Sequence, residues 1–64
     1  MKGDDKENLV RFEQLRIEFH KTKDARRRRA VVTQMLDCFR NGLVPGHMEM
    51  KLGITWNVYW RARL

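Results

Sequence analysis

The sequence predicts a small all-α domain of three to four helices, and three observations lead to this fold class. Apolar residues recur at three- and four-residue spacing within residues 4–20 and 24–41, as they do on one face of an α-helix. Asn41-Gly42 and Pro45 then end the second helical pattern. A chain of 64 residues forms one domain at most, and its single cysteine has no disulfide partner. We therefore expect a single domain, 1–64, that helical packing, a dimer interface or a ligand stabilises in place of disulfides.

Residues 4–20 are predicted to form an amphipathic helix. Its apolar residues at helical spacing are Leu9, Phe12, Leu15 and Phe19. Acidic residues stand at its start, where the helix dipole favours negative charge. Alternation at period two within 10–19 leaves a strand as the alternative. Because no other segment requires the apolar face of this helix, we expect two copies of the chain to dimerise through it.

Residues 24–41 are predicted to form a second helix, capped by Thr22 or Asp24. Its broad apolar face comprises Val31, Val32, Met35, Leu36, Cys38 and Phe39. Because Cys38 lies on this face, we expect it to be a small buried apolar residue and not a nucleophile. His20 and His47 have no carboxylate or cysteine at ligand spacing. The sequence therefore predicts no catalytic residue, no metal site and no cofactor, and the chain is not expected to be an enzyme.

The net charge of +6 is unevenly distributed along the chain. The candidate phosphate-binding cations are Lys21, Lys23, Arg26, Arg27, Arg28, Arg29 and Arg63. Each cation that neutralises a phosphate releases counterions, so such a cluster favours a polyanion. Arg26 and Arg29 share a helical face, whereas the stem of Arg28 is expected to cover the apolar stripe and leave its guanidinium in solvent. An acidic protein or an anionic membrane would also suit the cluster, and a solvated helix end without a ligand is the remaining alternative.

Two patterns fit the last twenty residues. In the first, Pro45 opens a helix over 45–52, Gly53 turns in a left-handed conformation, and Thr55 caps a final helix. In the second, apolar residues alternate strictly over 48–64, as they do in a strand. That strand would have to fold back on itself. The alternative fold is therefore two helices followed by a C-terminal β-hairpin, and a tail that is disordered or ordered only by a partner is the third possibility.

The first pattern carries a resemblance. Residues Asn41-Gly42-Leu43, Leu52-Gly53-Ile54-Thr55 and Tyr59-Trp60-Arg61 are similar to the helix-turn-helix of resolvases, sigma factors and small phage or plasmid regulators. The resemblance implies a helical DNA-binding unit over 24–63 whose last helix enters the major groove. The inward residues would be Met48, Leu52, Ile54, Tyr59 and Ala62, and the base-reading residues Thr55, Trp56, Asn57, Trp60 and Arg61. Glu49 departs from the motif, which usually has alanine there.

The side chains on the expected outer face suit base reading. Asn57 can pair with both hydrogen-bonding groups of an adenine edge, and Arg61 can form two bonds to guanine. The sequence thus predicts a sequence-specific transcriptional regulator that binds double-stranded DNA as a homodimer, with an intracellular, cytoplasmic or nucleoid-associated location. No apolar run approaches the roughly 20 residues that span a bilayer, so no membrane partner is expected.

Two other classes of function remain open. One is a protein-binding inhibitor or adaptor whose partner contacts a hot spot formed by Trp56, Tyr59 and Trp60. The other is an RNA-binding protein in which the arginine-rich helix enters folded RNA.

Overall fold

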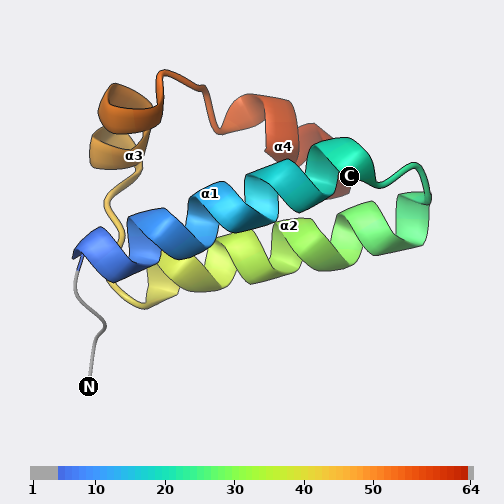
Figure 1. Ribbon diagram of the computed structural model, residues 1–64, viewed down its shortest axis with the longest axis horizontal. Coiled ribbons are helices and arrows are strands. Elements are labelled where there is room, and N and C mark those ends of the chain that lie inside the picture. Colours follow the sequence, from blue (N-terminus) through green and yellow to red (C-terminus); the bar gives the residue numbers. More distant parts are fainter. Residues whose placement is uncertain (1–4, 64) are drawn as a thin grey trace.

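The computed structural model describes residues 5–63, and these residues form four α-helices (Figure 1). In chain order they are α1 (Asp5–Lys21), α2 (Ala25–Arg40), α3 (Pro45–Leu52) and α4 (Asn57–Arg63). The predicted all-α class is confirmed. The strand expected as an alternative for 10–19 and the C-terminal hairpin are both wrong for the part of the chain that is described.

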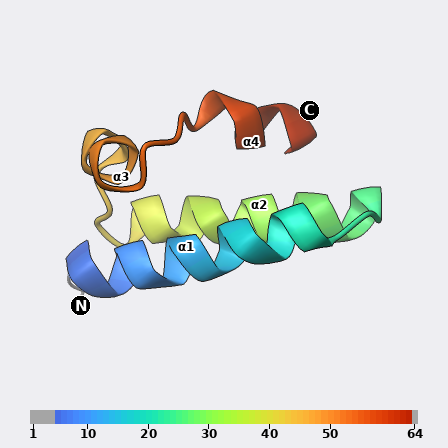
Figure 2. The ribbon, with the colours of Figure 1, turned by 45° about the horizontal axis from the view of Figure 1, so that its top comes forward.

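α1 and α2 form an antiparallel pair, and α4 lies along one face of that pair (Figures 1 and 2). Asp24 caps α2 as expected, since its carboxylate accepts a hydrogen bond from the Arg26 amide at 3.2 Å. At the other end of the pair, the buried side chain of Asn8 donates to the Asn41 carbonyl at 3.2 Å. The start of α1 is thereby tied to the end of α2.

The core lies between the helix pair and the two short C-terminal helices. The largest fully buried side chains are Phe12, Val31, Val32, Met35, Cys38 and Met48. The partly buried residues Leu52, Ile54 and Ala62 pack against this cluster from the C-terminal segment. The inward residues predicted for that segment therefore do face the core. None of the described helices is long and apolar enough to cross a membrane.

The apolar face of α1 is part of this core. Leu9, Phe12, Leu15 and Phe19 are each at most 9% exposed. The dimer surface expected on this face is therefore wrong, because other elements of the same chain already cover it. The apolar side chains that α1 leaves exposed are those of Val10, 53% exposed, and Ile17, 44% exposed.

The turn between α3 and α4 has the backbone geometry that the sequence predicted. Pro45 is the first residue of α3, and Gly53 ends it at φ 66° and ψ 29°, in the left-handed region. α3 is seen end-on in Figure 2, whereas α4 lies across the view at the far side of the connecting loop, so the two helices do not run side by side. The alternation over 48–64 does not mark a strand, because α3 and α4 cover most of this stretch, and two of its apolar residues, Met50 and Val58, are 79% and 58% exposed.

Candidate nucleic-acid interface

The start of α4 is fixed by Trp56. The centroid of its ring lies 4.9 Å from that of Phe39 and 5.7 Å from that of Phe12, so one tryptophan contacts both long helices. Trp56 is half-buried and packs against the core. The prediction that Trp56 lies exposed on the outer face is therefore wrong. The packing of α1 against α2 brings Phe12 and Phe39 together to receive the ring.

One turn later, Tyr59 anchors the middle of α4. It is 2% exposed, and its ring meets the Phe19 ring edge-on with centroids 5.3 Å apart. Its hydroxyl oxygen lies 3.2 Å from Nε2 of His20. The pKa of Arg16 is raised first by its hydrogen bonds to Glu13 and then by a hydrogen bond to this hydroxyl. α4 is therefore tied to α1 by both apolar and polar contacts.

These contacts also bear on the aromatic hot spot considered for a protein partner. Tyr59 is buried, and Trp56 is held between α1 and α2. Trp60 is half-buried, with its ring centroid 6.3 Å from that of Trp56. The cluster packs largely within its own chain, so Tyr59 and Trp56 are not free to serve as an exposed hot spot.

The outer face of α4 and the residue before its first turn are polar. Thr55, Asn57 and Arg61 are exposed, as predicted for base-reading positions. Val58 is also exposed, although the sequence analysis gave it no site role. The helical period could have predicted this exposure, because the residue directly before the inward-facing Tyr59 points about 100° away from it. Three of the five predicted base-reading residues are therefore exposed to solvent, whereas Trp56 and Trp60 are half-buried.

Glu49 has a role at the entry to α4. Its Oε1 accepts a hydrogen bond from the Trp56 amide at 3.4 Å, and its side chain is exposed. The side chain of Thr55 makes no such bond within the described residues; the Thr55 carbonyl accepts from the Val58 amide at 3.3 Å. The capping role expected of Thr55 is therefore wrong. The carboxylate at 49 is also not buried between helices, so it carries no desolvation cost there.

The four arginines divide into two kinds. Arg27 forms an ion pair with Glu18. Arg28 donates from Nε to the Thr22 carbonyl at 2.8 Å, and its guanidinium carbon lies 4.8 Å from the centroid of the Phe19 ring. The expectation that the Arg28 guanidinium points into solvent is therefore wrong. These two arginines stabilise the turn between α1 and α2.

Arg26 and Arg29 are exposed, and their side chains have no hydrogen-bond or ion-pair partner among the described residues. They lie one turn apart on α2, near the exposed Lys21 and Lys23. We call these four cations the basic end. The last turn of α4 lies toward the same end of the molecule as the α1–α2 turn (Figures 1 and 2). The side chain of Arg63 lies outside the described part of the structure.

No group of three or more metal-ligating side chains comes together within residues 5–63. Cys38 is fully buried, and burial raises the pKa of its thiol because the thiolate would lose its hydration. A buried thiol of this kind is a poor nucleophile.

Comparisons with protein-family models, with curated proteins and with solved structures found no match to this chain. The geometry of α4 and of the basic end is therefore what indicates a function for this chain.

Proposed function

We propose that this chain is a sequence-specific DNA-binding regulator of transcription, acting in the cytoplasm. The observation that carries the proposal is the division of α4 into two faces. Tyr59 and the half-buried Trp56 hold one face on the core, while Asn57 and Arg61 stand on the other. An amide and a guanidinium one turn apart on an exposed helix are the groups that recognise adenine and guanine in the major groove.

The backbone from α3 to α4 supports a helix-turn-helix. A four-residue connection, 53–56, joins the two short helices and begins with a left-handed glycine. α4 packs on α2, as the last helix of such a unit packs on the helix before the motif. Glu49, the departure from the usual alanine, is accommodated because it is exposed and bonds the Trp56 amide.

The basic end would supply contacts to the DNA backbone. Arg26 and Arg29 are solvent-exposed and free of ion pairs within the described residues, and the net charge of the chain is +6. Backbone contacts fix the register of a protein on the duplex, while base contacts give the specificity. One short helix reads few base pairs, so we propose that two copies act on half-sites about 34 Å apart.

Selection of bound sequences from a pool of random duplexes tests this proposal. We expect one enriched motif, and we expect Asn57→Ala and Arg61→Ala each to lose about 1–3 kcal/mol of discrimination at one base pair. Gln34→Ala is the matched control, because Gln34 is an exposed polar residue on the helix that supports α4. An enriched motif that is unchanged by both α4 substitutions would show that another surface reads the bases. Failure to enrich any duplex, or preferential capture of folded RNA, would overturn the proposal.

A further inference from the structure

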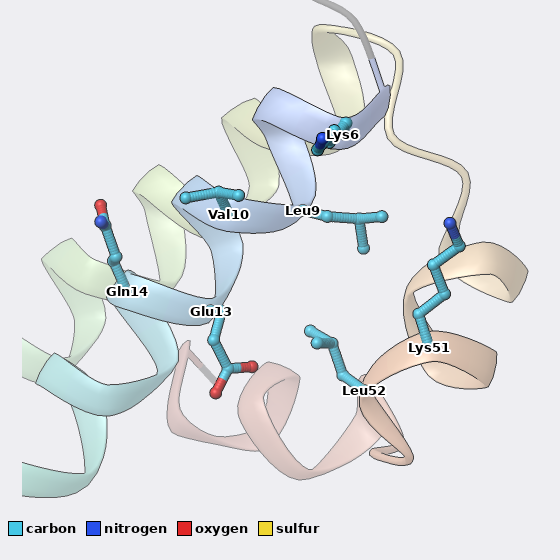
Figure 3. A pocket seen from close by; sticks show the side chains of 7 residues that line it. All are labelled: Lys6, Leu9, Val10, Glu13, Gln14, Lys51 and Leu52. Carbon is cyan, nitrogen blue, oxygen red and sulfur yellow. The ribbon is translucent and has the colours of Figure 1, made fainter.

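The outer side of α1 carries an apolar groove beside α3 (Figure 3). Its volume is about 430 Å³, and it is open to solvent. Leu9 of α1 and Leu52 of α3 point toward one another across it, and Val10 borders it (Figure 3). Lys6 and Glu13 lie at its two ends, and Lys51 lies on the α3 side. No helix of the described residues occupies this groove.

A second hollow lies on the other side of Val10, against Glu7 and Arg11. Lys6, Val10 and Gln14 line both hollows. These three residues follow the four-residue spacing of an α-helix, so they form a ridge with a depression on each side. Helices pack by placing such ridges into the grooves of a neighbour. The surface therefore has the shape that receives another helix.

The charges of the groove indicate which helix it receives. Lys6 and Glu13 carry opposite charges and lie seven residues apart, or about 10 Å along the axis of α1. A two-fold axis passing between Leu9 and Val10 relates position 6 of one copy to position 13 of the other. Each Lys6 then faces Glu13 of the second copy, whose carboxylate also pairs with Arg16 of its own chain, while the apolar residues meet on the axis. An interface between identical chains needs this kind of self-complementarity.

We propose that the groove is a homodimer interface in which α1 of a second copy packs antiparallel on α1, with Val10 at the centre and two symmetric Lys6–Glu13 ion pairs. The surface differs from the apolar face of α1 that the sequence suggested, because that face is in the core. A role of this interface in regulation rests on the proposed function. The interface itself can exist without that function, so it is tested in the absence of DNA.

The measurement is sedimentation equilibrium of the full chain from micromolar to millimolar concentration. We expect a concentration-dependent dimer, with Val10→Asp raising its Kd by about tenfold or more. Val58→Asp is the matched control, because Val58 is a valine of similar exposure on α4 that lines neither hollow. Val58→Asp should leave the Kd unchanged. Far-ultraviolet circular dichroism checks that both variants keep their helices, since both side chains are already exposed.

A charge exchange tests the orientation of the two copies. Lys6→Glu and Glu13→Lys should each weaken the dimer, and the double variant should restore it by reversing every pair. Glu18→Lys is the control for Glu13→Lys, because Glu18 also pairs with an arginine of its own chain but lies outside the groove. The control should leave the dimer intact.

Several results would overturn the interface. A monomer at every concentration would do so, as would equal effects of Val10→Asp and Val58→Asp. A double variant that remains as weak as the single ones would refute the antiparallel arrangement. A dimer that behaves as expected in a chain that binds no duplex would overturn the proposed function alone. A monomer that binds a specific duplex would overturn this interface alone.

Discussion

The two kinds of arginine in α2 predict that phosphate binding and folding can be separated by substitution. Arg26→Gln with Arg29→Gln removes two exposed guanidiniums that have no partner among the described residues. Each phosphate contact contributes about 0.9 to the slope of log K against log salt. Loss of both should reduce the slope by about 1.8 and weaken binding about 60-fold at 0.1 M salt. Glutamine keeps helix propensity close to that of arginine, so the fold should be retained.

The complementary pair, Arg27→Gln with Arg28→Gln, should affect stability instead. Arg27 would lose an exposed ion pair with Glu18, worth at most about 1 kcal/mol. Arg28 would lose its position over the Phe19 ring, worth about 0.5–1 kcal/mol, and a hydrogen bond to Thr22, worth about 1 kcal/mol. The free energy of unfolding should fall by about 2 kcal/mol. The salt slope should change much less than in the first pair.

Both double variants are measured in two assays. Fluorescence anisotropy with a labelled duplex of mixed sequence, repeated across a salt series, gives the slope. Urea denaturation followed by circular dichroism gives the free energy of unfolding. If the two pairs lower the slope equally, the intrachain contacts of Arg27 and Arg28 do not decide which arginines bind phosphate. If neither pair lowers it, the basic end does not contact the DNA backbone.

Three further outcomes follow from the packing. Tyr59→Phe keeps the ring but loses the hydroxyl contacts with His20 and Arg16, so urea denaturation should show a loss of about 1 kcal/mol. Gly53→Ala meets no atom within 4 Å, yet its φ of +66° should cost about 1–2 kcal/mol in the same assay, and an unchanged stability would contradict the left-handed turn. Cys38 should react with a thiol reagent at pH 8 far more slowly in the folded chain than in urea, because burial raises the pKa of its thiol; equal rates would contradict the burial.

The local parts of the fold could be predicted because single residues determine them. Asp24 caps α2, Pro45 begins α3 and Gly53 ends it, each at the position where its backbone or side-chain chemistry is favoured. The resemblance to a helix-turn-helix also placed Met48 and Tyr59 in the core, where both are at most 2% exposed. Chemistry of this kind acts over a few residues and is visible in the sequence.

The errors concern contacts between segments far apart in the chain. Arg28 was expected to point its guanidinium into solvent, but it contacts the Phe19 ring near the end of α1 and the carbonyl of Thr22 just after that helix. The apolar face of α1 was assigned to a dimer because the sequence does not show that α2 and the C-terminal segment cover it. A periodic pattern indicates which face of a helix is buried, but it does not indicate which other segment or chain covers that face.

The aromatic side chains of α4 that pack on the core determine which way the exposed residues of this helix point. Trp56 and Tyr59 are three residues apart at the start of α4, and both rings pack on the Phe12 ring. When these positions face the core, the helical period turns Asn57 and Arg61, four residues apart, to the opposite side. The orientation of the outer face therefore depends on a ring that would not touch DNA. In the proposed function, a substitution at Trp56 should accordingly disturb base recognition by rotating α4.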